Sequence, residues 1–509
     1  MNSPSAGSRS VWMTTVLPKF PILQEKLETD VCVIGGGIAG LTAAYLLSRE
    51  GRSVVLIDAA EIGCGETGRT TAHFFPPDNR YFEIEDAFGA ENARLVAESF
   101  QQATALVETI VEQEGIDCEF ERLNGYLFSL NPEGNADLDR EFEAARKAGV
   151  EIGKKGQVPD VSFITGPCLE FRNQAQFHPL KYLGGLIEAF RRKGGSIYTR
   201  TRALDISRCG TALKVITESG SIVAHAVVVA TNTPFNDDVV MHTKQAAYRT
   251  YVVGIRVPKG SVPRILLWDN GDPYHYIRLT TPDDKSEEEI LVVGGADHKV
   301  GQDEHPVHRY DEIEAWVRKR YPMAGPVDFK WSGQVMEPAD GIGYMGRNPM
   351  DDKNVYVITG DSGNGMTHCT AGAMVVTDLI MGRDNAWQDL YDPARKPIHG
   401  MPEFLQELGN TVMQYADWVK GGDVESPAQI QPGKGAILRQ GGRKLAVYRD
   451  DNGVLHAFSA ACTHMGCVVS WNAAETSWDC PCHGSRFSVS GEVLHGPAVM
   501  PLEAAQVDP

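Results

Sequence analysis

The chain has 509 residues, 42% of them hydrophobic and 23% charged, which is enough for about three globular domains of ordinary soluble composition. Its formal net charge of −19 at pH 7 argues against nucleic acid and anionic membranes as partners. No stretch reaches the roughly 18 consecutive apolar residues that a membrane span requires, and residues 1–29 lack the pattern of a secretory signal. We therefore expect no membrane span, a cytoplasmic location, and an N-terminal arm (1–29) that either packs on the body or frays.

The first informative pattern is typical of a dinucleotide-binding turn. The apolar run 31–34 predicts a β-strand, and the spacing of apolar residues in 41–47 predicts a helix. Between them lies a G-x-G-x-x-G sequence, whose glycines permit a tight turn and a close approach of the backbone to a pyrophosphate at the helix N-terminus. A second predicted strand, 53–57, ends in Asp58, eighteen residues beyond Gly40. Because a carboxylate there binds ribose hydroxyls and repels a 2′-phosphate, the pattern disfavours NADP and leaves FAD and NAD open.

Three later segments follow, or end, predicted apolar strands. They are GCGETGRTT at 63–71, VVVAT at 227–231 and GDSGNGMT at 360–367. Together they resemble the D-amino-acid-oxidase-like FAD oxidoreductases, the family of glycine, sarcosine and γ-glutamylputrescine oxidases. In that family the Arg-Thr-Thr stretch lies by the pyrophosphate and flavin, and the Gly-Asp segment reaches the ribityl chain and isoalloxazine. Alternatively, these glycines mark ordinary loop turns that bind no cofactor.

The resemblance implies FAD as the cofactor. The apolar stretch 366–380 also predicts a helix, whose N-terminus would direct N–H donors toward the flavin N1/C2 carbonyl region. His73 follows the Arg-Thr-Thr stretch closely, so we expect it near the isoalloxazine, with covalent attachment of the flavin as an open alternative. The residues expected to bind FAD are Gly35, Gly37, Ile38, Ala39, Gly40, Asp58, Arg69, Thr70, Thr71, His73, Ala230, Thr231, Gly360, Asp361, Gly363, Asn364, Gly365, Met366 and Thr367.

Two segments of different character interrupt these motifs. The first contains a predicted polar helix, 85–114, and the second contains strand-like runs and a predicted helix, 311–321. We expect them to form an α+β substrate domain whose strands cover the flavin, composed of residues 81–177 and 241–325. The FAD-binding domain is then discontinuous and consists of residues 30–80, 178–240 and 326–385.

The catalytic candidates are His275 and Tyr276, on the strand-like run 274–279. Oxidation of an amine or alcohol by a flavin needs little acid–base chemistry beyond an oriented group that accepts a proton. An ordinary alternating strand, which would bury one of the two side chains and expose the other, is the alternative. His178, which precedes a predicted helix, is interpreted as structural.

Near the C-terminus two short loops each offer one thiolate and one imidazole. Cys462 and His464 lie in the sequence CTHMGC, and Cys480 and His483 lie in CPCHGSRF. Two sulfurs on one iron and two imidazoles on the other are the ligands of a Rieske [2Fe–2S] cluster, whose reduction potential lies between about −150 and +300 mV. A mononuclear zinc site is the alternative, although common zinc spacings pair like residues instead of mixing Cys with His in each loop.

The region 424–509 resembles the Rieske proteins. The resemblance implies that the spare cysteines of the two loops, Cys467 and Cys482, form a disulfide; free thiols are the alternative in a reducing cytosol. Ser485 keeps one hydroxyl donor to a cluster sulfur, whereas Phe487 stands where many high-potential relatives carry a tyrosine, so we expect a middling or low potential. The other six cysteines are scattered without a pairing pattern and are expected to be thiols.

The predicted fold class is α/β, with a Rossmann-like FAD-binding domain, an inserted α+β substrate domain and a small all-β Rieske domain (424–509). A helical stretch, 403–420, belongs to a predicted linker, 386–423, because the composition then shifts to short strands. The motifs at 268–278 and 332–338 fit the members of the flavin family that are fused to a Rieske domain.

The sequence contains only one complete dinucleotide fingerprint. Enzymes that draw electrons from NADH through FAD usually carry two, so we expect the hydride to come from a small-molecule substrate, an amine or amino acid. Electrons would leave singly through the cluster to an external one-electron acceptor, either a protein or a quinone. Two other functions stay open: a flavin and iron–sulfur reductase that serves a partner enzyme, and a redox sensor.

Overall fold

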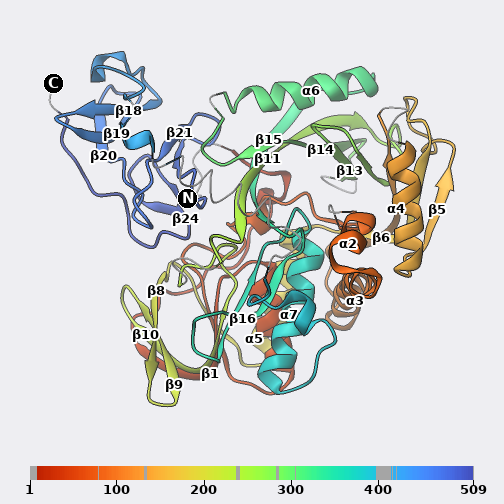
Figure 1. The fold of residues 1–509 in the computed structure, drawn as a ribbon, viewed down its shortest axis with the longest axis horizontal. Helices are drawn as coiled ribbons and strands as arrows, with labels where there is room; N and C mark the ends of the chain where they lie inside the picture. Colours follow the sequence, from red (N-terminus) through yellow and green to blue (C-terminus); the bar gives the residue numbers. More distant parts are fainter. Residues whose placement is uncertain are drawn as a thin grey trace.

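An eight-stranded sheet carries the dinucleotide turn. In the computed structural model, which describes residues 8–77, 80–130, 135–236, 241–281, 286–303, 305–396, 414, 416–419 and 421–507, its order is β16-β17-β10-β1-β2-β7, with β9 and then β8 continuing from β10 (Figure 1). The five strands from β17 to β7 are parallel, and β16 is antiparallel to β17. The bounds are β1 (Lys26–Ile34), β2 (Val54–Ile57), β7 (Ser196–Tyr198), β8 (Ala203–Cys209), β9 (Ala212–Thr217), β10 (Ser221–Val229), β16 (Tyr344–Arg347) and β17 (Val355–Thr359).

The two faces of this sheet are covered differently. Val31 and Val33 of β1 pack in the hydrophobic core that includes three helices, whereas Cys32 and Ile34 point to the other face and pack with the β8–β9 hairpin. All four residues of β2 are buried, as expected for an internal parallel strand. The three helices are α1 (Ile38–Arg49), α5 (Pro179–Arg192) and α7 (Gly365–Met381).

A nine-stranded sheet forms the second layer, in the order β15-β11-β14-β13-β12-β4-β6-β3, with β5 paired to β6. Strand β15 lies within the predicted FAD-domain segment that starts at residue 326. It nevertheless pairs with β11 and therefore belongs to the second sheet, not to the dinucleotide sheet. The bounds are β3 (His73–Phe74), β4 (Glu121–Phe128), β5 (Ile152–Lys155), β6 (Cys168–Gln176), β11 (Gln245–Pro258), β12 (Leu266–Asp269), β13 (His275–Thr280), β14 (Glu288–Lys299) and β15 (Val327–Pro338).

The helices around the second sheet differ in detail from those predicted. The expected helix 85–114 is two helices, α2 (Tyr81–Phe88) and α3 (Ala90–Glu114), because Gly89 adopts a φ of +83° that ends the first one. The expected helix 311–321 is α6 (His308–Arg320), which packs on β11 and β14 (Figure 1). Two further helices are α4 (Asn135–Lys147) and α8 (Gln388–Tyr391).

The C-terminal region consists of short antiparallel strands in two small sheets, drawn in blue in Figure 1. They are β18 (Lys434–Gln440), β19 (Arg443–Arg449) and β20 (Leu455–Ser459) in one sheet, and β21 (Ser470–Asn472), β22 (Ser477–Asp479), β23 (Arg486–Phe487) and β24 (Val493–His495) in the other. The predicted helical stretch 403–420 falls almost entirely outside the described residues, which include only Gln414 and the short 3₁₀ turn η4 (Ala416–Val419) of it. No helix among the described residues is long and apolar enough to cross a membrane.

Buried charges join the C-terminal region to the rest of the protein. Arg69 Nη1 lies 3.4 Å from Glu475 Oε2, and Arg249 Nε lies 3.9 Å from Asp479 Oδ2. Arg486 contacts both carboxylates, at 3.6 Å and 3.1 Å. All five side chains are at most 3% exposed. Three guanidinium groups and two carboxylates therefore form one buried network across the boundary, which we call the seam network.

From Ser8 onward, the N-terminal arm packs on the body and joins this network. Ser8 Oγ donates to Glu475 Oε1 over 2.5 Å, and Trp12, which is fully buried in η1 (Val11–Thr14), donates from Nε1 to Thr70 O over 2.6 Å. Of the two possibilities for this arm, the described part from Ser8 onward therefore shows the packed one.

We predict that Glu475→Ala lowers the free energy of unfolding by about 3–5 kcal/mol, because it leaves buried Arg69 without a carboxylate. Burial opposes the ionised form of Glu475, but the nearby Arg69, Arg486 and Arg249 hold its pKa below the usual value. The stabilisation is therefore complete above the unfolded-state pKa of about 4.3 and is lost as pH falls through the lower folded-state pKa.

Urea denaturation followed by tryptophan fluorescence measures this effect. Glu91→Ala is the control, because it removes only the exposed ion pair with Arg94, and it should leave the midpoint unchanged. Equal midpoints for the two variants would contradict a stabilising seam network.

Candidate functional site

The glycine turn after β1 brings three backbone segments into close contact. Gly35 has a φ of +112°, and a Cβ there would lie 2.3 Å from Ala230 O at the end of β10. A Cβ on Gly40 would lie 1.9 Å from Gly35 O, so α1 could not begin where it does with a larger residue. Asp58 Oδ2 accepts a hydrogen bond from Gly36 N over 2.6 Å, and Oδ1 accepts one from Ala60 N over 2.7 Å. The carboxylate thus ties the end of β2 to the turn.

A cavity of about 1250 Å³ opens over this turn. Single small-molecule sites usually have about 300–1,000 Å³, so the cavity has room for a dinucleotide and a small substrate. The predicted residues in its wall are Gly35, Gly37, Ile38, Ala39, Asp58, Arg69, Thr70, Thr71, Ala230, Thr231, Tyr276, Asp361, Gly363, Gly365 and Met366. The predicted residues outside its wall are Gly40, His73, His275, Gly360, Asn364 and Thr367.

The N-terminus of α7 faces this cavity, with Gly363, Gly365 and Met366 in the wall. The free N–H groups and the positive end of the helix dipole suit a polar, electron-accepting ring. Burial raises the pKa of Asp361 to about 6, although Met336 N donates to its Oδ1. Burial also raises the pKa of Glu337 to about 7, although Ser362 Oγ donates to it over 2.7 Å. Two acids thus lie close to the start of the helix.

The two catalytic candidates point to opposite sides of β13. Tyr276 lines the cavity, whereas His275 Nδ1 lies 3.1 Å from Asp269 Oδ2 and its ring stacks on Trp316, 4.3 Å between centroids. Both side chains are buried, because α6 covers the far face of the sheet. The alternative, in which one of the two is exposed, therefore does not hold. Tyr276 fits close to the neighbouring strand because its partner in β14 is Gly294.

Side chains that the sequence did not single out complete this end of the cavity. Thr250 Oγ1 and Tyr276 Oη lie 2.7 Å apart, and Tyr274 Oη donates to Asp297 Oδ2 over 2.8 Å. Burial raises the pKa of Asp297 to about 6, while hydrogen bonds from Thr250 and Tyr274 partly offset this. Two features of the sequence could have identified these side chains. The two-residue period of a β-strand places Tyr274 on the same face as Tyr276, and Asp297 lies at the end of an apolar strand.

The remaining histidine candidates have structural partners. His73 Nδ1 lies 3.0 Å from Thr71 Oγ1 and its Nε2 lies 3.4 Å from Ile277 O. Burial and the Arg278 guanidinium lower the pKa of His73 to about 3. His178 Nδ1 accepts from Lys181 N over 3.2 Å and caps α5, as expected of a structural residue.

The two cysteine-histidine loops converge in the C-terminal region. Cys462 and Cys480 are each 2% exposed, and the rings of His464 and His483 lie 5.1 Å apart. The buried Nδ1 of His483 has no hydrogen-bond partner within the part of the chain that the structure describes, as expected of a metal-ligating atom. The donor set thus fits a cluster bound by two thiolates and two imidazoles.

The hydrogen bonds around the cluster loops agree with two sequence expectations. Hydrogen bonds from Cys480, the backbone of His464 and the Ser485 side chain lower the pKa of Cys462, whereas the hydrogen bond to Cys462 raises the pKa of Cys480. Phe487 is fully buried and offers no hydroxyl group.

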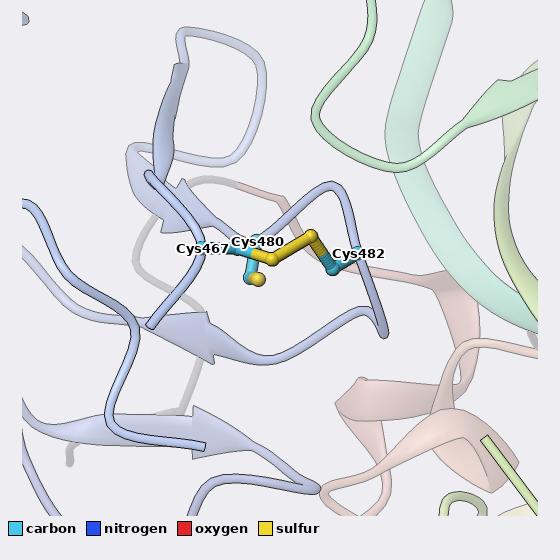
Figure 2. Close-up of side chains that lie close together, drawn as sticks. All are labelled: Cys467, Cys480 and Cys482. Atoms are coloured by element: carbon cyan, nitrogen blue, oxygen red, sulfur yellow. A yellow bond between two sulfur atoms is a disulfide. The ribbon is translucent and has the colours of Figure 1, made fainter. Parts of the chain in front are cut away.

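Cys467 and Cys482 form a disulfide that joins the two loops, as predicted (Figure 2). The sulfur of Cys480 lies within 4.8 Å of both. Since two of these three sulfurs are bonded to each other, only Cys480 remains as a thiolate ligand, together with Cys462 of the other loop. The six scattered cysteines form no disulfide.

Comparison with known proteins shows the family. The family described as FAD dependent oxidoreductase matches residues 30–379, and the Rieske [2Fe-2S] domain matches residues 421–506. The chain belongs to the FAD-dependent oxidoreductases and carries a C-terminal Rieske domain. It binds FAD and a [2Fe-2S] cluster, so the alternatives of NAD and of mononuclear zinc are set aside.

Individual relatives of this FAD-dependent oxidoreductase agree with that assignment. YhfW of Bacillus subtilis (strain 168), named as a Rieske 2Fe-2S iron-sulfur protein, is 35% identical over 507 residues, which cover 98% of this chain and 97% of YhfW. Gamma-glutamylputrescine oxidoreductase of Escherichia coli (strain K12) is 26% identical over 71% of this chain and 86% of its own length. The structure of glycine oxidase from Geobacillus kaustophilus has a TM-score of 0.61 at 18% identity, over 73% of this chain and 99% of that one, and shows the shared fold.

We predict that Asp58→Ala weakens FAD binding and leaves the iron content unchanged. The variant loses charge-assisted hydrogen bonds to Gly36 and Ala60, which are worth about 1.5–3 kcal/mol each. Titration of the apoprotein with FAD and an iron assay measure the two effects. Asp30→Ala, which removes a similar bond to Ser53 N, is the control and should retain FAD affinity. Parallel loss of flavin and iron would contradict separate cofactor sites.

We predict that Cys462→Ser and Cys480→Ser each abolish the cluster, whereas Cys467→Ser and Cys482→Ser retain it with lower stability. The first pair removes thiolate ligands, and the second pair removes only the loop-to-loop bond. Iron and acid-labile sulfide assays, followed by the decay of visible absorbance on warming, distinguish the two outcomes. Identical behaviour of all four variants would overturn this division of roles.

Proposed function

We propose that this FAD-dependent oxidoreductase is a dehydrogenase that oxidises a small amine or amino acid and passes the electrons singly through the Rieske cluster to an external acceptor. The observation that carries the proposal is that one cavity is lined by both halves of the protein. Beside the glycine turn and α7, its wall contains Arg486, Val493, Leu494, His495, Gly496, Ala498 and Val499 of the Rieske domain. A cavity shared in this way brings the two redox centres close to each other.

When bound, FAD supplies hydride acceptance from a substrate carbon, and the cluster supplies one-electron transfer. The chain's own residues then orient the substrate. One end of the cavity is lined by Tyr276, Thr250 and Tyr274. Behind them, Asp297 accepts hydrogen bonds from Tyr274 and Thr250. An acid with a pKa near 6 in this position is suited to hold or accept a proton at neutral pH.

Two observations favour an amine as the substrate. The Asp297 carboxyl behind Tyr274 suits a cationic group better than an anionic one. The relative named gamma-glutamylputrescine oxidoreductase also spans most of the flavin region. A cytoplasmic location and a protein or quinone as acceptor, both expected from the sequence, remain part of the proposal.

We predict that an amine or amino acid bleaches the flavin under anaerobic conditions and that NADH does not. A panel containing γ-glutamylputrescine, glycine and L-proline, mixed with the holoenzyme in a stopped-flow instrument, tests this. Bleaching by NADH or a reduced ferredoxin alone would instead support a reductase, and no bleaching by any of these reagents would support a sensor.

We predict that His464→Ala removes the Rieske EPR signal and leaves substrate-driven flavin bleaching intact. Turnover with a protein acceptor such as cytochrome c should then fall, because the variant lacks the cluster that transfers single electrons but still transfers hydride to FAD. The His456→Ala variant is the control, because it removes a half-exposed histidine of the same domain that pairs with Asp450; it should retain both the EPR signal and acceptor turnover. Undiminished turnover of the His464 variant with oxygen alone would recast the protein as a simple oxidase.

A further inference from the structure

The histidine side of the cluster loops faces the flavin-binding body. His242, in the turn that precedes β11, is 4% exposed. Its ring centroid lies 4.7 Å from that of His464 and 5.3 Å from that of His483. The two predicted imidazole ligands therefore pack against a histidine from the other half of the chain.

A second contact connects this side of the cluster loops to the cavity. Gln334 of β15 is 2% exposed and lines the cavity. Its Nε2 donates to Gly484 O over 3.2 Å, and Gly484 directly follows His483. The same Nε2 lies 3.4 Å from Nδ1 of His495, another cavity-lining residue of the Rieske domain. One side chain thus touches both the cavity and the peptide next to a cluster ligand.

The backbone around Gln334 is arranged for this contact. Gly484 has a φ of +80°, and a Cβ there would lie 2.6 Å from both Gln334 Nε2 and Ala247 Cβ. Only glycine allows the loop to approach β15 so closely. On the other side, the backbone N of Gln334 donates to Glu66 Oε2 over 2.6 Å, and Glu66 is itself in the cavity wall.

We propose that Gln334 is a positioning residue that connects the FAD cavity to the cluster, and that electrons pass across its contact with Gly484 and His483. This inference rests on the proposed function, since it names the route by which the electrons leave the cavity. Two electrons leave the substrate as a hydride and cross this contact one at a time, so each turnover reduces two equivalents of a one-electron acceptor. The seam network holds the Rieske domain against the body, so transfer needs no movement of that domain.

Laser-flash photoreduction of the holoenzyme with 5-deazariboflavin tests the route without any substrate. The observable is the rate of cluster reduction that follows flavin reduction, and independence from protein concentration identifies transfer within one molecule. We expect Gln334→Leu to slow this step at least about tenfold, as typical for the loss of a hydrogen bond around a metal ligand. FAD content, iron content and the Rieske EPR line shape should stay unchanged.

Two further variants make the result decisive. Gln334→Glu keeps the side-chain volume but replaces the donor to Gly484 O, so it should also slow the step even if the leucine variant fails to fold. Gln176→Leu is the matched control, because Gln176 is equally buried in the same sheet and its side chain donates to Glu121, away from the Rieske domain; it should transfer at the wild-type rate.

The possible failures are distinct. Wild-type protein in which the cluster is not reduced after the flavin would overturn the proposed function together with the route. If the wild-type protein transfers electrons to the cluster and the rate changes less than twofold in Gln334→Leu and Gln334→Glu, only the role of Gln334 is overturned.

Discussion

The seam network is the interaction on which the rest of the arrangement depends. Arg69 follows the turn η2 (Glu66–Gly68) in the cavity wall, Arg249 lies on the second sheet, and both reach carboxylates of the Rieske domain. Burying five charges is costly unless each is paired, so the network permits essentially one relative position of the two halves. In that position β24 closes the cavity and the cluster loops meet His242 and Gln334. Pairing of charges thus determines where the redox centres lie relative to each other.

The parts that the sequence predicts well are those encoded by neighbouring residues. The strand, glycine turn and helix at 31–47 and the two cysteine-histidine loops each have a local physical requirement, so spacing alone identifies them. The break at Gly89 was missed because a single glycine inside a polar helical pattern does not reveal its φ. The placement of β15 in the second sheet depends on pairing with β11, more than seventy residues earlier in the chain, which periodicity does not report.

The candidate site shows the same limit at the level of side chains. Arg69 was expected by the flavin and does line the cavity, but its guanidinium is engaged by Glu475, 406 residues away in the sequence. His275 and Tyr276 are adjacent, and only the burial of both faces of β13 decides which one meets the cavity. The contact of Gln334 could not be predicted from the sequence around it, because its partner, Gly484, lies in a loop of another domain.

The ordered arm has a consequence for biosynthesis. Ser8 contacts Glu475, 467 residues later in the chain, and Trp12 lies against the Arg-Thr-Thr stretch of the cavity wall. At roughly 5–20 residues per second a ribosome needs on the order of half a minute to a minute and a half to make that intervening length. Ser8 therefore cannot reach its final position until Glu475 has been synthesised. The wall of the flavin cavity also contains Arg486 and Val499, so the cavity is completed only after the Rieske domain has been synthesised.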